Sequence, residues 1–145
     1  MVNRDVIAAK LVDLSGRVAQ VRKHCPEEMK QLAANHDTLD LVSFNLMLAV
    51  QSCADIASHI IADERWPAAR SLAEGFERLV DHGILDRATA QALGKAVGLR
   101  NVIAHGYAAL DVAMLHTAAT RGVTDLDAFA RQISAWVDEQ TQPAT

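Results

Sequence analysis

Two apolar stripes with a period of 3.5 residues constrain the fold of this chain more than any other feature. Steps that alternate between four and three residues place apolar side chains along one side of a helix. Helices that carry such stripes pack side by side at shallow angles. The stripes consist of Ile7, Leu11, Leu14, Val18, Val21 and Cys25, and of Val42, Leu46, Ala49, Cys53, Ile56 and Ile60. They predict an all-α, antiparallel helical bundle.

Capping residues and prolines predict where the helices begin and end. Pro26 ends or restarts the first helix, and Asp37 is the expected N-cap of the second long helix. Pro67 suits the first turn of a third helix, and Asp86 caps the fourth. A short helix is expected over residues 110–119, and Thr124 begins the last one. The prediction is therefore a four-helix core with short extra helices.

Length and composition favour one helical domain. Only 4% of the 145 residues are aromatic, and we find neither a strand pattern nor an internal repeat. We expect residues 1–140 to form a single domain and residues 141–145 a disordered tail. The surplus of apolar surface on the long helices suits a homodimer, although the same surface can also belong entirely to the core of one chain.

The charge and the N-terminal sequence bear on partners and location. The formal net charge is −4, so any contact with nucleic acid requires a local basic patch. The first ten residues lack the apolar core of a signal peptide, and the longest apolar runs are too short to span a bilayer. These features predict a soluble, cytoplasmic chain with no membrane partner.

The cysteines support the same location and do not indicate a metal site. Cys25 and Cys53 sit in helical patterns without a partner spacing, which favours a reduced compartment. His24 and His36 lie near Cys25 in the sequence, but their spacing matches no closed zinc site. We expect neither a metal nor a cofactor.

Residues 99–107 carry the most informative group of polar side chains. Arg100, Asn101, His105 and Tyr107 stand here among alanine, valine, leucine and glycine. A guanidinium suits a phosphate, and histidine is the side chain that most readily transfers protons near neutral pH. Metal-free cleavage of a phosphodiester needs this combination. The alternative is that these residues are surface or capping residues.

Helical geometry separates the polar groups of this segment. On an ideal helix Arg100 and Tyr107 share a face, and Asn101 and His105 form an i, i+4 pair. Arg100 and His105 project about 140° apart. They can converge through the reach of the arginine side chain, through a distortion near Gly106, or across a dimer interface.

A second polar stripe follows the long helix over residues 42–60. Asn45, Ser52, Asp55 and His59 recur there at helical spacing beside the apolar stripe. They are possible cleft-lining residues, with Asp55 paired to Arg100. The alternative is a solvated face or a satisfied hydrogen-bond pair between helices.

The string of residues 100–107 resembles the signature of the HEPN superfamily, in particular its HepT-like toxin branch. Three further segments are similar to conserved blocks of those proteins, and the likeness extends from about residue 5 to residue 136. These segments are Phe44–Leu46 with Cys53–Ile61, Pro67–Leu79, and Gly83–Ile84. The resemblance implies a HEPN-like helical bundle.

The resemblance also implies an activity. Such proteins are homodimers whose two Arg-x4-His motifs meet in a composite cleft and act as a metal-independent endoribonuclease. His105 would transfer protons as the RNA 2′-hydroxyl attacks its neighbouring phosphate. Arg100 would stabilise charge on that phosphate, and Asn101 would orient the substrate or the imidazole. The implied substrate is RNA and not DNA, since RNA carries its own nucleophile.

The implied partner is a minimal nucleotidyltransferase antitoxin of a type VII-like toxin–antitoxin system. It silences the toxin by transferring AMP to the tyrosine of the motif, which corresponds to Tyr107. The alternative is a non-catalytic helical interaction or nucleotide-binding module that docks a nucleotidyltransferase.

Overall fold

The two predicted stripes fold as the two longest helices of the computed structural model, which describes residues 2–106 and 110–141. The helix α1 spans Arg4–His24 and α3 spans His36–Asp63. The remaining elements are α2 (Met29–Ala34), α4 (Leu72–Asp81), α5 (Arg87–Ala104), α6 (Val112–Thr117), a π-helical turn (Ala118–Gly122) and α7 (Val123–Thr141). No strand occurs in these two ranges, and the predicted all-α class is confirmed.

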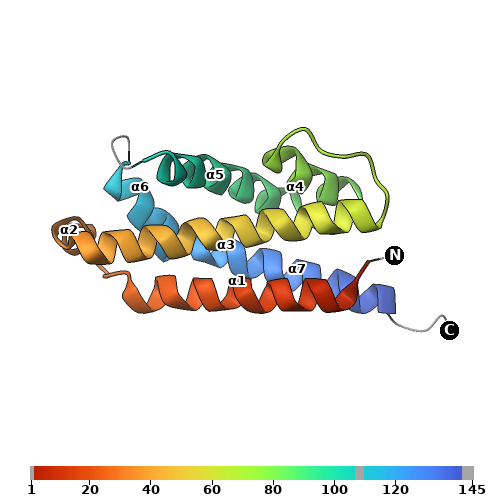
Figure 1. Cartoon of the computed structure of the whole chain (residues 1–145), viewed down its shortest axis with the longest axis horizontal. Helices are drawn as coiled ribbons and strands as arrows, with labels where there is room; N and C mark the ends of the chain where they lie inside the picture. The colour runs from red at the N-terminus through yellow and green to blue at the C-terminus, as the bar shows by residue number, and fades with distance from the viewer. Residues whose placement is uncertain (1, 107–109, 142–145) are drawn as a thin grey trace.

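The helix α3 is the central element of the bundle. It contacts α1 on one side, α4 and α5 on the other, and α7 behind (Figure 1). Neighbouring long helices run in opposite directions, so α1, α3, α5 and α7 form the antiparallel four-helix core, with α4 paired to α5. This arrangement places the C-terminal end of α5 beside the N-terminal half of α3.

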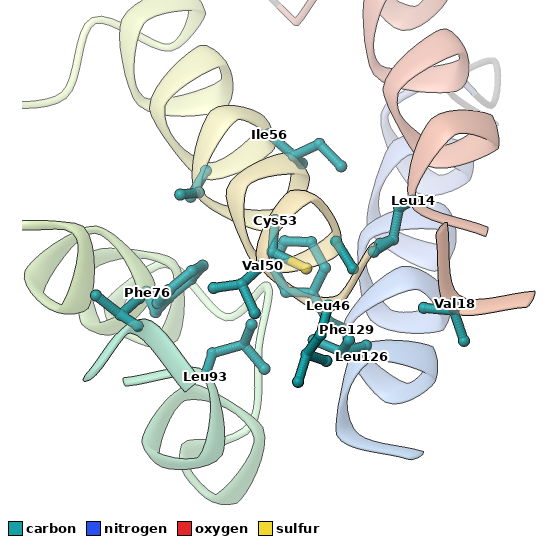
Figure 2. Packing of buried hydrophobic residues seen from close by; sticks show 14 of the residues in the cluster. Leu14, Val18, Leu46, Val50, Cys53, Ile56, Phe76, Leu93, Leu126 and Phe129 are labelled. Atoms are coloured by element: carbon teal, nitrogen blue, oxygen red, sulfur yellow. The ribbon is translucent and has the colours of Figure 1, made fainter. Parts of the chain in front are cut away.

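The core of the bundle consists of the residues of the two stripes and of side chains from α4, α5 and α7. All six residues of the second stripe are buried, as are four of the six of the first. The rings of Phe76 and Phe129 meet edge to face at 5.9 Å between centroids, and Leu93 and Leu126 lie in the same cluster (Figure 2). Burial raises the pKa of the Cys53 thiol, which therefore stays protonated as a small apolar core group.

Two helices begin at residues other than those expected. Asn35 caps α3 through its side chain, which accepts a hydrogen bond from the backbone N–H of Thr38, so Asp37 lies inside the helix. Ser71 caps α4, and Pro67 lies in the preceding loop instead of the first helical turn. The predicted ends were wrong there because several good capping residues stand close together in the sequence.

The C-terminal helices differ from the prediction in how they are joined. The helix α7 begins at Val123, one residue before the predicted Thr124, but the π-helical turn joins it directly to α6, so residues 112–141 are helical without a break. The hydroxyl of Thr124 donates a hydrogen bond to the carbonyl of Arg121, at 2.7 Å. The predicted cap at Asp86 is confirmed, since its side chain accepts a bond from the N–H of Thr89 at 2.7 Å.

The helix α3 also meets the length and composition expected of a membrane span. Its uninterrupted apolar runs are short, but the most apolar window of 18 residues has a mean hydropathy of 1.3. Within that window 56% is buried inside the protein. Such burial is also found in the core helix of a soluble protein, so this feature is weak evidence for a membrane.

Candidate active site

The end of α5 exposes the histidine of the Arg100–His105 segment. His105 is the C-cap of the helix, and its backbone N–H donates to the carbonyl of Asn101 at 3.0 Å. Gly106 follows with a φ of 116°, in the region that favours glycine. The helix therefore ends at this point and leaves His105 exposed.

The side chain of Arg100 is held between α5 and α3. Its guanidinium donates one hydrogen bond to Oε1 of Gln51 on α3 and another to Oδ1 of Asn101, the latter at 2.7 Å. Gln51 in turn donates from Nε2 to Oδ1 of Asp55 at 2.9 Å. We call these four residues the Arg100 cluster. The cluster fixes the direction of the guanidinium relative to the central helix.

The charge of Arg100 is not neutralised by these contacts. Both oxygens that accept from it belong to neutral amides, and no carboxylate within the described ranges forms an ion pair with it. A guanidinium has five N–H donors in a fixed fork. An oriented, unneutralised guanidinium at a half-buried position is well suited to bind a phosphate.

The structure places the four predicted cleft-lining residues in different environments. Asp55 belongs to the Arg100 cluster, but it reaches Arg100 through Gln51 and not by the expected direct pair. No hydrogen bond in the described part of the chain joins Ser52 to the cluster. Asp55 is thus the only one of the four that the hydrogen bonds of the described residues connect to Arg100.

Asn45 and His59 face other parts of the bundle. The side chain of Asn45 is buried between α1 and α3, where it accepts from Arg17 at 3.1 Å and donates to the carbonyl of Leu41 at 2.9 Å. His59 lies 3.6 Å from Asp63, two helical turns beyond Gln51. Within the described residues neither is joined to Arg100, because Asn45 binds Arg17 of α1 and His59 lies two helical turns farther along α3 than Gln51. Asn45 instead fits the alternative of a satisfied hydrogen-bond pair between helices.

Gln51 is the residue of the cluster that the sequence interpretation missed. It stands four residues before Asp55, on the same face of α3, and it is half-buried. Its position in a run of apolar residues was the available signal. The sequence alone does not predict that Gln51 accepts a hydrogen bond from Arg100, because this contact depends on how α5 packs against α3.

The helix end also changes the geometry expected for the tyrosine. Because α5 ends at Ala104, an ideal helix does not continue from Arg100 to Tyr107, and the shared face predicted for them does not follow. Tyr107 itself lies outside the described residues. For metal binding, no group of three or more His, Cys, Asp or Glu side chains in the described ranges could hold an ion.

A family model described as Ribonuclease HepT-like matches residues 14–133. This range contains the whole of the central helix, the whole of α5 and just over half of α1 and of α7. The chain belongs to the HepT-like ribonuclease family. The resemblance seen in the sequence is thereby confirmed at the level of the family.

Known proteins agree with the assignment to the HepT-like family. The mRNA nuclease HepT of Shewanella oneidensis is 24% identical over 131 residues, which cover 90% of this chain and 98% of that protein. The tri-AMPylated Shewanella oneidensis HEPN toxin, solved in complex with the MNT antitoxin, superposes with a TM-score of 0.84 at 23% identity, over 92% of this chain and 99% of the toxin.

A third similar protein is the cytosolic protein of unknown function YutE from Bacillus subtilis. It has a TM-score of 0.84 at 16% identity, and the match covers 99% of this chain and 96% of YutE. These structural likenesses show that the chain shares the helical-bundle fold of both proteins.

The glycine that ends α5 provides a test of this geometry. We expect Gly106→Ala to lower the free energy of unfolding by about 1–2 kcal/mol, because an L side chain is strained at a positive φ. Gly98→Ala is the matched change inside α5, where no heavy atom lies within 4 Å of an added Cβ. It should stabilise the protein by about 0.5–1 kcal/mol. Urea denaturation measures both, and equal effects of the two changes would contradict this account of the helix end.

Proposed function

We propose that this chain is the toxin of a type VII-like toxin–antitoxin pair and that it cleaves RNA as a metal-independent endoribonuclease. The observation that carries the proposal is the Arg100 cluster, which holds an unneutralised guanidinium beside the helix end that exposes His105. Membership of the HepT-like ribonuclease family supports the same activity. We also infer a cytoplasmic location, which the two free cysteines support.

The proposed reaction uses the nucleophile that RNA itself contains. The 2′-oxygen forms a bond to the neighbouring phosphorus while the bond from phosphorus to the 5′-oxygen breaks. His105 takes the proton from the 2′-hydroxyl, and a protonated imidazole supplies one to the departing 5′-oxygen. Arg100 stabilises the charge that develops on the phosphate. Asn101 positions the guanidinium through its amide oxygen.

Both proton transfers are accounted for if two copies of the chain share one cleft. Within one chain the guanidinium points towards α3, whereas the imidazole is at the end of α5. A homodimer would bring a second His105 to the same phosphate, so that one histidine accepts a proton while the other donates one. We therefore propose a composite site between two subunits.

The exposed face of α3 is the proposed dimer surface. Leu41 and Phe44 are large apolar side chains with exposed fractions of 38% and 49%. Helical spacing places them on the same face as Gln51 and Asp55, so an apolar surface continues directly into the Arg100 cluster. Exposed apolar side chains next to a polar site are typical of an interface between proteins.

Catalysis is tested by removing the two central groups. We expect the wild type to slow bacterial growth and to cleave RNA in the presence of EDTA, and we expect it to leave the DNA of the same sequence intact. Arg100→Ala and His105→Ala should each lower the cleavage rate by about 10²–10⁴-fold. His36→Ala and Arg131→Ala, at exposed residues outside the site, are the controls. Equal toxicity and cleavage by wild type and His105→Ala would refute the catalytic role of His105, and a wild type that cleaves no RNA would instead favour the non-catalytic interaction module.

The dimer is tested by placing a charge on the proposed surface. We expect Phe44→Asp to convert a dimer into a monomer and to lower RNA cleavage by at least about tenfold, because the charge would have to be buried in the interface. Val12→Asp is the control, since Val12 is 70% exposed on α1. Analytical ultracentrifugation measures the change in mass. A fully active monomeric wild type would refute the composite site.

We further propose that a minimal nucleotidyltransferase antitoxin silences the toxin by transferring AMP to Tyr107. The chain contains a single tyrosine, so intact-protein mass spectrometry is a direct readout. Co-expression with the antitoxin should add one or more AMP units to the wild type and none to Tyr107→Phe. The modification should also abolish RNA cleavage, because a bulky anion attached seven residues after Arg100 and two after His105 in the sequence would compete with the substrate phosphate. A wild type that stays unmodified and is nevertheless silenced would refute this mechanism.

A further inference from the structure

A large groove runs along the side of α5 that faces the C-terminal helices. It lies between α5 and the continuous helix of residues 112–141, and it includes residues of α3. Its volume of about 750 Å³ falls within the range of about 300–1,000 Å³ that is typical of ligand sites. Aliphatic side chains line most of it, among them Met47, Val50, Leu93, Leu99 and Leu126.

The groove is basic although the chain as a whole is acidic. Lys95, Arg100 and Arg121 line it, whereas Asp125 is its one acidic residue among those that the structure describes. Neither Lys95 nor Arg121 forms an ion pair within the described ranges. On a chain with a formal net charge of −4, this is the kind of local basic patch that an anionic ligand requires.

The π-helical turn shapes this groove. Ala118, Arg121 and Gly122 all belong to the turn and all line the groove. A π-helical turn inserts one extra residue into an α-helix; such turns are rare and are frequently found at functional sites. The hydroxyls of Thr120 and Thr124 satisfy carbonyls at this irregular segment, each at 2.7 Å. The turn is therefore a stable feature that presents a cation to the groove.

We propose that the groove is a nucleotide subsite that holds an unpaired base of the RNA strand next to the scissile phosphate. The base would lie on the aliphatic surface, and flanking phosphates would contact Arg121 and Lys95. Cationic grooves follow the backbone of single-stranded RNA, and an unpaired base can be held between aromatic or apolar side chains. Arg100 lines the groove and also belongs to the cluster, so one strand can pass from the subsite to the cleavage site. The two cations favour the phosphates of an RNA strand over an apolar helical segment of a protein.

This inference rests on the proposed ribonuclease function, so its test separates binding from cleavage. The probe is a fluorescent 2′-O-methyl oligonucleotide, which cannot be cleaved because its 2′-oxygen carries no proton. Fluorescence anisotropy measures its affinity for the full-length protein. An abasic oligonucleotide of the same length serves as the second probe, since it retains the phosphates but lacks the bases.

The phosphate contact is tested with Arg121→Ala. We expect it to weaken binding of both probes by about three- to tenfold and to lower the salt dependence, the slope of log K against log salt, by about 0.7. Arg131→Ala removes an exposed charge from α7 outside the groove and should leave both quantities unchanged. Equal behaviour of these two variants would overturn the phosphate contact.

The base contact is tested with Ala92→Leu, which fills the groove two turns away from Arg100. We expect it to weaken binding of the base-containing probe by at least about fivefold while the abasic probe is unaffected. The control is Ala135→Leu on the exposed side of α7. Equal weakening of both probes, or a change in oligomeric state without a change in RNA binding, would overturn the base subsite.

Cleavage of unmodified RNA is measured in parallel. Groove-dependent binding without cleavage would refute the ribonuclease function and leave the subsite standing. If the wild type cleaves RNA and the groove variants bind and cleave RNA as their controls do, the subsite alone is refuted. A wild type that neither binds nor cleaves RNA would refute both.

Discussion

The hydrogen bond from Arg100 to Gln51 is the interaction on which the proposed site depends. It joins the last turn of α5 to the middle of the central helix, and it holds a guanidinium that would otherwise sample many rotamers. Asn101 supplies a second acceptor, and Asp55 fixes the amide of Gln51. The two acceptors orient the guanidinium of Arg100. Because both are neutral amides, they leave its positive charge available to a substrate phosphate.

The fold provides this contact through packing and not through the polar residues themselves. The central helix is buried along one side over its whole length, and its position in the core is therefore rigid. Its other face carries Leu41, Phe44 and Gln51 in succession. Apolar burial thus orients α3, and α3 in turn offers one acceptor to α5 and an apolar face for a second subunit.

The sequence predicted the helices well because a helix is determined by the spacing of residues close together in the chain. The stripe of six residues that begins at Val42 is buried throughout, as its spacing required. The partner of a side chain on a different helix is not local information, since it depends on the relative rotation of two helices. Asn45 was therefore grouped with the cleft although it binds Arg17, and Gln51 was overlooked. The π-helical turn of residues 118–122 likewise carries no capping or periodicity signal.

The central claim is that Gln51 contributes to RNA cleavage only by positioning Arg100. A double-mutant cycle of kcat for RNA cleavage, with Gln51→Leu and Arg100→Ala, tests it directly. The account predicts that Gln51→Leu lowers kcat by about tenfold in the wild type, with little change in KM, and has no further effect once Arg100 is alanine. Equal losses of kcat from Gln51→Leu in both backgrounds, or wild-type cleavage by Gln51→Leu, would contradict it.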